Sequence, residues 1–191
     1  GSHIVTIYDG GFCVFTIPFM VEEPTEIEFD TDLTNISCNG GNTGSITVNA
    51  TGGSGAIQYA ISPNLTVFTS QNVYTNLTAG NYTIIAQDAL GCTVSETVTI
   101  NEPSVIDISL GAVTQELCTN DANGSITINV TGGVAPYSTS LNNTTSYVPN
   151  QFTFSNLIGG QTYTIYVRDA NNCVSSIQVT LDAPVTINPT A

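Results

Sequence analysis

The feature that most constrains the fold of this chain is an internal repeat. Residues 44–53, Gly-Ser-Ile-Thr-Val-Asn-Ala-Thr-Gly-Gly, return at 124–133 as Gly-Ser-Ile-Thr-Ile-Asn-Val-Thr-Gly-Gly. Residues 82–103 return at 163–184 with the same order of tyrosine, aspartate, cysteine and proline, and that part occurs once more near the start of the chain. The copies recur about every 80 residues, which exceeds the roughly 20–50 residues of a solenoid unit and suits a small independent domain.

The pattern within each repeat predicts β-structure. Apolar Ile46 and Val48 alternate with polar Thr47 and Asn49, which is the period of a half-buried strand. Short β-rich runs end about every 8–12 residues at Gly, Asn, Pro or Asp, as in an all-β sandwich. We count seven such runs in each complete repeat. The sequence therefore predicts an all-β chain of tandem immunoglobulin-like (Greek-key) β-sandwich modules.

The repeat also predicts how the chain is divided. Residues 1–3 are expected to be a tag remnant, and residues 4–26 the C-terminal β-hairpin of a truncated repeat. Residues 27–104 and 105–186 are expected to be complete immunoglobulin-like repeats, followed by the start of the next linker at 187–191. Each complete repeat ends at a proline, and such short, stiff connections predict a semi-rigid array.

Composition excludes several functions. The chain has 15 Asp and Glu residues but only one Lys or Arg, for a net charge of −14. Nucleic acids and anionic membrane surfaces need basic patches, so we expect neither as a partner. The longest apolar runs are too short for a membrane span, so no membrane insertion is expected. With no lysine, and no histidine beyond His3, the chain lacks the groups that activate a serine nucleophile, and we expect no enzyme activity.

These motifs resemble the SprB repeat of Bacteroidetes surface proteins, a repeat named for a gliding-motility adhesin. The shared pattern is a cysteine, a Gly-Ser-Ile strand, Thr-Gly-Gly, an aromatic strand, Leu-x-x-Gly-x-Tyr, Asp-Ala-x-x-Cys and Glu-Pro. Residues 27–104 match throughout, residues 105–185 match with Ala183 in place of the glutamate, and residues 4–26 match the last third.

The resemblance implies a non-enzymatic segment of a cell-surface adhesin, exported by type IX secretion to the bacterial outer cell surface. Two roles remain open. The repeats are either a stalk or spacer in adhesion or gliding motility, or adhesive modules that bind carbohydrate or surface ligands. The implied partners are neighbouring repeats of the same protein and extracellular polysaccharide or surfaces, and no cofactor is implied.

The five cysteines predict a disulfide framework with more than one possible pairing. Pairing within modules would join Cys38 to Cys92 and Cys118 to Cys173, leaving Cys13 unpaired. However, we count five strands between Cys38 and Cys92, and an odd number places the two at opposite ends of a sandwich. A disulfide needs Cα atoms within about 7 Å. This argument favours an inter-module bond between Cys38 and Cys173, although free thiols also remain possible.

An acidic cluster raises the possibility of a Ca²⁺ ion, which binds six to eight oxygen atoms, several of them from carboxylates. The acidic residues alternate with apolar ones from Glu26 onward, and this pattern favours the solvent-facing side of a half-buried strand. The candidate calcium ligands are Glu22, Glu23, Glu26, Glu28, Asp30 and Asp32.

Aromatic residues offer the one visible candidate for a carbohydrate site, since they could stack on sugar rings. Modules this small need most of their aromatic side chains in the core, so we expect most of these to be buried. The residues concerned are Tyr59, Phe68, Tyr74, Tyr137, Tyr147, Phe152 and Phe154.

The apolar N-terminal hairpin at 4–24 needs a partner, because an isolated hairpin is marginally stable in water. We expect it either to pack against the next module or to extend a sheet edge of a neighbouring chain. Its apolar residues are Ile4, Val5, Ile7, Phe12, Val14, Phe15, Ile17 and Phe19.

Overall fold

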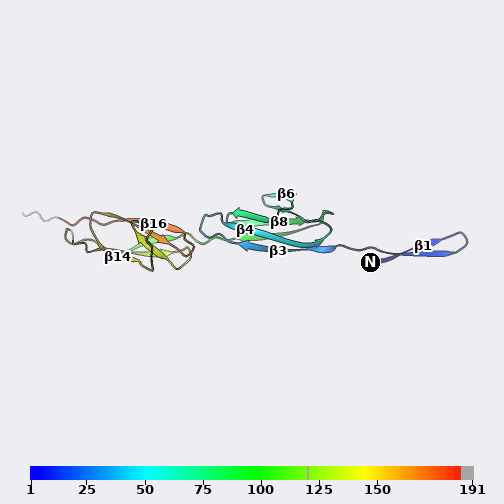
Figure 1. Ribbon diagram of the computed structural model, residues 1–191, viewed down its shortest axis with the longest axis horizontal. Helices are drawn as coiled ribbons and strands as arrows, with labels where there is room; N and C mark the ends of the chain where they lie inside the picture. Colours follow the sequence, from blue (N-terminus) through cyan, green and yellow to red (C-terminus); the bar gives the residue numbers. More distant parts are fainter. Residues whose placement is uncertain (120, 186–191) are drawn as a thin grey trace, which may run out of the picture. The chain divides into compact units, whose positions relative to one another are not determined.

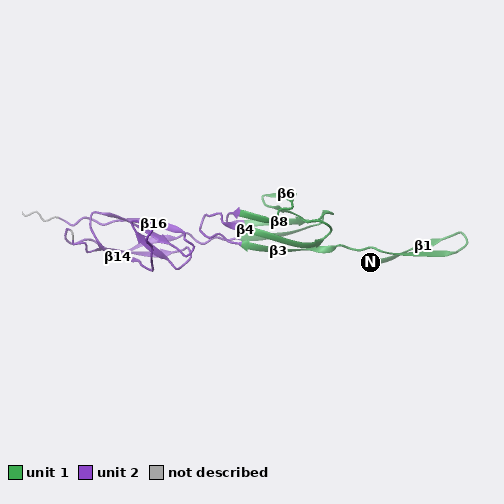
Figure 2. Ribbon diagram, viewed as in Figure 1, with its two compact units in different colours: residues 1–33, 45–75, 81–99 green, residues 34–44, 76–80, 100–191 purple. Residues whose placement is uncertain are grey.

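The computed structural model describes residues 1–119 and 121–185, and these form two compact units (Figure 2). Unit 1 comprises residues 1–33, 45–75 and 81–99, and unit 2 comprises 34–44, 76–80 and 100–191. One end of the first repeat therefore belongs to the same unit as the second repeat. The segment expected to start the next linker, 187–191, lies outside the described residues, as does residue 186.

The first repeat is a sandwich of a three-stranded and a four-stranded sheet, as the alternating pattern predicts (Figure 1). Alternate residues of its second strand, Ile46 and Val48, are fully buried, as are Ile84 and Ala86 on the opposite sheet. The sheets have the orders β3-β4-β7 and β6-β5-β8-β9. Their strands are β3 (Thr25–Thr34), β4 (Gly44–Gly53), β5 (Gln58–Ile61), β6 (Asn64–Thr69), β7 (Val73–Leu77), β8 (Gly80–Gln87) and β9 (Thr93–Ile100).

The second repeat has the same topology, with sheets β10-β11-β14 and β13-β12-β15-β16. Its paired strands are antiparallel, with Ile126 opposite Phe154 in one sheet and Thr139 opposite Val167 in the other. The strands are β10 (Asp107–Thr114), β11 (Gly124–Thr131), β12 (Ser138–Leu141), β13 (Val148–Pro149), β14 (Thr153–Leu157), β15 (Thr162–Arg168) and β16 (Val174–Thr180). The described residues thus form an all-β chain of immunoglobulin-like sandwiches, as predicted.

The core of the second repeat lies between its two sheets. Ile126 and Ile128 on β11 face Ile165 and Val167 on β15, and each is at most 1% exposed. Tyr163 fastens the crossing into β15, because its hydroxyl group donates a hydrogen bond of 3.0 Å to the Ile158 carbonyl oxygen. The same hydroxyl oxygen accepts a bond of 2.9 Å from the Ile158 amide. This is the tyrosine corner known from immunoglobulin-like sandwiches.

The Thr-Gly-Gly motif ends the second strand of each repeat with a turn that needs glycine. Gly52 and Gly53 have φ values of 81° and 64°, and Gly132 and Gly133 have 72° and 59°. A Cβ atom at Gly52 would collide with the Glu26 carbonyl oxygen, just as one at Gly132 would collide with that of Val105. The motif is therefore a structural element common to both repeats.

The N-terminal hairpin pairs β1 (Ser2–Tyr8) with β2 (Val14–Met20), so β1 includes two residues of the expected tag remnant. Every residue from 1 to 26 is exposed, including Phe15 at 64% and Ile4 at 65%. The prediction that the hairpin packs against the next module is therefore wrong. The linker 21–24 contains no strand residue and is itself exposed, so nothing holds the hairpin's apolar side chains against the sandwich. Pairing with another chain stays a prediction.

Candidate functional site

The loop before the last strand of each repeat is built around one aspartate carboxylate. Oδ1 of Asp169 accepts hydrogen bonds of 2.9 Å from the amides of Asn171 and Cys173, and Oδ2 accepts one of 3.0 Å from Val134. Asp169 is buried, and both of its carboxylate oxygens accept hydrogen bonds from backbone amides. The carboxylate therefore fixes the loop backbone that presents the cysteine.

The earlier copies use the same arrangement. Oδ1 of Asp88 accepts bonds of 3.0 Å from Leu90 and 2.8 Å from Cys92, and Oδ1 of Asp9 accepts bonds from Gly11 and Cys13. The Ser54 amide, 2.9 Å from Oδ2, is the main cause that holds the pKa of Asp88 below its ordinary value; burial opposes it, and the other loop amides add to the lowering. The pKa of Asp9 is also lowered, first by the Cys13 amide and then by that of Gly11. Such bonds favour the charged carboxylate.

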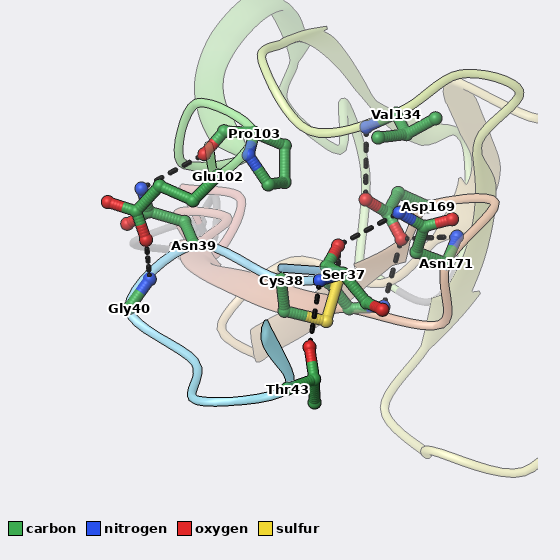
Figure 3. Close-up of a disulfide and its surroundings, with 11 residues drawn as sticks. Ser37, Cys38, Asn39, Gly40, Thr43, Glu102, Pro103, Val134, Asp169 and Asn171 are labelled. Atoms are coloured by element: carbon green, nitrogen blue, oxygen red, sulfur yellow. Dashed lines mark hydrogen bonds between the residues drawn. A yellow bond between two sulfur atoms is a disulfide. The ribbon is translucent and has the colours of Figure 1, made fainter. Parts of the chain in front are cut away.

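A disulfide joins Cys38 to Cys173, with the Cα atoms 5.6 Å apart. Both residues belong to unit 2. Beside the bond, the Asn171 side-chain amide donates to the Ser37 carbonyl oxygen at 2.8 Å, and the Ser37 amide donates to Thr43 Oγ1 at 3.0 Å (Figure 3). The loop that carries Cys38 is therefore held by hydrogen bonds as well as by the covalent bond.

The same loop is held on its other side by the segment that links the two repeats. The Asn39 side-chain amide donates to the Pro103 carbonyl oxygen at 3.0 Å, and the Gly40 amide donates to a Glu102 carboxylate oxygen (Figure 3). All four residues lie in unit 2. The Glu-Pro pair that ends the first repeat thus also accepts the hydrogen bonds that hold the Cys38 loop, in addition to stiffening the connection.

The structure has the inter-module disulfide that the strand count favours. The within-module alternative is wrong: Cys38 and Cys173 are bonded to each other, while Cys92, Cys118 and Cys13 are free and exposed. The physical reason is the one expected from sequence, because five strands, β4 to β8, separate Cys38 from Cys92. An odd number of strands leaves the two at opposite ends of the first sandwich.

Among the described residues, no three acidic, His or Cys side chains are grouped so that they could hold a metal ion, and calcium binding by the acidic cluster stays a prediction. Glu26, Glu28, Asp30 and Asp32 alternate along β3, and Glu22 and Glu23 precede it. The four acidic residues of β3 are exposed and form the solvent-facing side of that strand, as the alternating pattern favours.

The seven aromatic side chains considered for carbohydrate stacking are buried or half-buried. Tyr59 and Phe154 are buried in their sandwiches, and Tyr137 and Phe152 pack against the core of the second repeat. Phe68, Tyr74 and Tyr147 are half-buried, and the Tyr147 ring lies 4.2 Å from the guanidinium carbon of Arg168.

Sequence reasoning missed the residues that flank the disulfide. Asn171 stands where the first repeat has Leu90, and Ser37 stands where the second repeat has Leu117. Because each polar residue occurs once, the internal repeat gave no signal for it. Asn39 carried no signal either, whereas Glu102 and Pro103 were visible as part of the repeated motif.

The geometry defines the class: tandem immunoglobulin-like repeats in which the loop of one repeat is disulfide-bonded beside the next. Two stretches of the chain, residues 31–66 and 110–146, match the family model of the SprB repeat. This confirms the resemblance drawn from the motifs. A comparison with curated protein sequences finds no match.

Two solved structures illustrate the similarity in fold. A C-terminal fragment of intimin, solved in complex with the intimin-binding domain of the translocated intimin receptor, is 18% identical with a TM-score of 0.41; the match covers 84% of this chain and 64% of the intimin fragment. Extracellular domains 3–5 of Drosophila OTK are 14% identical with a TM-score of 0.35, covering 97% of this chain and 71% of that one. This chain therefore spans less than two thirds of the intimin fragment.

The SprB matches and the disulfide together indicate a cell-surface or extracellular protein, since structural disulfides persist in oxidising compartments. Among the described residues, no helix is long and apolar enough to cross a membrane.

Proposed function

We propose that this chain is a non-enzymatic repeat segment of a secreted bacterial cell-surface adhesin, in which it acts as a semi-rigid stalk. In this role the repeats separate an adhesive part from the cell surface during adhesion or gliding motility. Type IX secretion would deliver the protein to the outer cell surface, where the neighbouring repeats are its first partners.

The Cys38–Cys173 disulfide is the observation that carries this proposal. It fixes the loop of one repeat within the same compact unit as the following repeat, and the Asn171, Asn39 and Glu102 contacts reinforce it. A stalk needs connections that resist bending, and a covalent bond beside a short Glu-Pro linker supplies one. The SprB matches at two stretches support the surface-adhesin context.

The burial of the candidate aromatic side chains favours the stalk role over the role of an adhesive module. Recognition of sugars by stacking needs open aromatic faces, and the seven candidates within the sandwiches are buried or half-buried. Acidic and polar residues occupy the outward positions of strands such as β3. These surfaces suit a spacer that does not itself hold the ligand.

The test replaces this segment in the intact adhesin with unrelated immunoglobulin-like repeats of matched length. A stalk predicts that adhesion and gliding persist with the matched replacement and fall when the segment is deleted or shortened. The purified chain is also applied to a glycan array. Loss of adhesion with the matched replacement, together with a specific glycan signal from the purified chain, would contradict the stalk and support the adhesive module.

A further inference from the structure

The disulfide lies beside a groove in unit 2, here called the Cys173 groove, with a volume of about 400 Å³. One side is formed by the start of the second repeat, the Gly133 turn and the Asp169 loop. The other side is formed by Cys38 and Asn39. The loop of the first repeat that carries Cys38 and Asn39 thus forms one wall of this groove, and the disulfide and the hydrogen bonds described above hold it there.

Unit 1 contains an equivalent groove beside Cys92, here called the Cys92 groove, with a volume of about 300 Å³. Its lining corresponds position by position to that of the Cys173 groove: Pro24 to Pro103, Ile27 to Ile106, Gly53 to Gly133, Asp88 to Asp169 and Cys92 to Cys173. It differs in lacking a counterpart of Cys38 and Asn39 in its lining. Residues 1–22 do not line it either, so the hairpin does not take the place of the loop.

The chain also carries a second copy of the loop that forms this wall of the groove. Cys118 corresponds to Cys38, and it is free and exposed. The Leu117 amide donates to Asn123 Oδ1 at 2.9 Å, which repeats the Ser37–Thr43 bond behind Cys38. The chain therefore contains one complete junction and the two separate halves of another.

The residues beside the two free halves are apolar where those beside the occupied junction are polar. In the occupied junction the Asn171 side-chain amide donates to the Ser37 backbone carbonyl oxygen, and the corresponding residues are Leu90 and Leu117. Leu90 is 69% and Leu117 is 76% exposed. Docking in the geometry of the occupied junction would place the Leu90 side chain beside the Leu117 backbone carbonyl oxygen, and burial of exposed leucine surface would favour association.

We propose that the Cys92 groove is a docking site for the Cys118 loop of a second copy of this chain, sealed by a Cys92–Cys118 disulfide. With oxidised glutathione as the oxidant, one cysteine thiolate attacks it and releases one glutathione thiolate. The second cysteine thiolate then attacks the protein-bound sulfur of the mixed disulfide and releases the other. Two protein thiols and one glutathione disulfide thus give one protein disulfide and two glutathione thiols.

This inference deepens the proposed function, because it names the partner of a stalk junction as another repeat of the same kind. Its test measures which thiols pair, and not adhesion. If the chain is a stalk without this docking site, the replacement experiment in the adhesin succeeds and the disulfide mapping fails. If the docking site exists but the chain is not a stalk, the mapping succeeds and the replacement experiment fails.

Cys13 provides a matched control within the same molecule. It is free and exposed, and it follows Asp9 with the same amide hydrogen bonds that precede Cys92. However, the chain has Thr-Gly-Gly turns only at 51–53 and 131–133, so no such turn can form the opposite wall beside Cys13. Random collision would let Cys118 pair equally with Cys13 and Cys92, whereas docking selects Cys92.

The experiment incubates the full-length purified chain, with Cys38–Cys173 intact, in a glutathione redox buffer and maps the intermolecular disulfides by non-reducing mass spectrometry. We expect Cys92–Cys118 to exceed Cys13–Cys118 by roughly tenfold or more, equivalent to about 1.4 kcal/mol of selective docking. Equal yields of the two, or a predominance of Cys92–Cys92, would overturn the proposal.

A variant separates docking from simple thiol reactivity. Leu90→Asn supplies the side-chain donor that Asn171 directs at the Ser37 carbonyl oxygen. In the same geometry it can donate to the Leu117 carbonyl oxygen, and we expect it to raise the Cys92–Cys118 yield severalfold. The rate of Cys92 alkylation by iodoacetamide in the monomer should remain unchanged, which shows that the thiol is still accessible. An unchanged yield of the cross-link in Leu90→Asn would show that the two halves do not meet in the geometry of the occupied junction, and it would overturn the proposed docking.

Discussion

The two repeats close the same end of the sandwich with different chemistry. In the first repeat Ile36 is 4% exposed and joins the apolar core, whereas the corresponding residue of the second repeat is Glu116, also 4% exposed. The Glu116 carboxylate accepts hydrogen bonds of 2.9 Å from Ala122 and 2.8 Å from Gly159. A buried charge needs such partners, and an isoleucine does not.

The partner Gly159 explains why the second repeat is longer at this point. The segment between Leu157 and Tyr163 has one residue more than the segment between Leu77 and Tyr82. In the longer loop, the Gly159 amide reaches the Glu116 carboxylate. The two repeats therefore share a common frame, made of the aspartate loops and the Thr-Gly-Gly turns. They differ in the residues that cover the end of the sandwich where Ile36 and Glu116 lie.

The common frame predicts the largest effect. Gly132→Ala would place a Cβ atom against the Val105 carbonyl oxygen in a backbone with φ of 72°, and we expect a loss of about 4 kcal/mol in the free energy of unfolding. Gly91→Ala is the matched control, because Gly91 also has positive φ but an open surrounding, and its cost should be about 1 kcal/mol. Urea unfolding measures both. Equal losses would show that conformational strain alone, without the collision, sets the cost.

The disulfide predicts the next effect. Cys38→Ser removes the covalent link, and we expect unit 2 to lose about 2–4 kcal/mol of unfolding free energy. The Gly40 amide, which donates to Glu102, should exchange faster with solvent. Cys92→Ser serves as the control, since Cys92 is free. A Cys92→Ser variant that loses as much stability as Cys38→Ser would contradict the difference between the two cysteine grooves.

The buried carboxylate predicts an effect specific to the second repeat. Glu116→Ala leaves the Ala122 and Gly159 amides without this acceptor, and we expect a loss of about 1.5–3 kcal/mol. Glu116→Gln retains one carbonyl oxygen and should recover part of that loss. Thermal unfolding compares the two variants. If Glu116→Ala unfolds at the same temperature as the parent chain, the carboxylate does not hold this end of the sandwich.

The smallest effect concerns pH and the Asp88 loop. Because folding lowers the pKa of Asp88 below 3.8, its contribution to stability is present in full above that value and is lost as the pH falls through the folded-state pKa. We expect Asp88→Asn to flatten the part of the acid-induced stability loss that belongs to the first repeat. Unfolding measured between about pH 2 and 5, with the carboxyl resonance followed by NMR, tests the sign. A carboxyl resonance that titrates above 3.8 would contradict it.

Much of the frame could be predicted from the sequence because its signals are local and occur more than once. The alternation of apolar and polar residues predicted a half-buried strand at residues 46–49, and the structure has β4 there, with the repeated segment in β11. The strand count also favoured the Cys38–Cys173 bond, since topology alone decides which loops share an end.

The junction contacts could not be predicted, because each depends on a single residue brought close by the fold. Asn171 contacts Ser37 across 134 positions of sequence, and nothing local distinguishes it from Leu90. From the sequence alone, Glu116 has the character of a surface residue. In the fold it is buried, and the Gly159 amide donates a hydrogen bond to its carboxylate. The N-terminal hairpin was expected either to pack against the next module or to extend a sheet edge of a neighbouring chain. Its apolar side chains are exposed in this chain. The sequence could not decide between the two, because apolar character indicates a need for burial without naming the partner.

The central claim is that a repeat is linked covalently to the loop of its neighbour and not closed upon itself. Non-reducing peptide mapping of the freshly purified chain tests this most directly. The account predicts one linked peptide pair containing Cys38 and Cys173, with Cys92 and Cys118 recovered as alkylated thiols. A peptide pair linking Cys38 to Cys92, or Cys118 to Cys173, would contradict it.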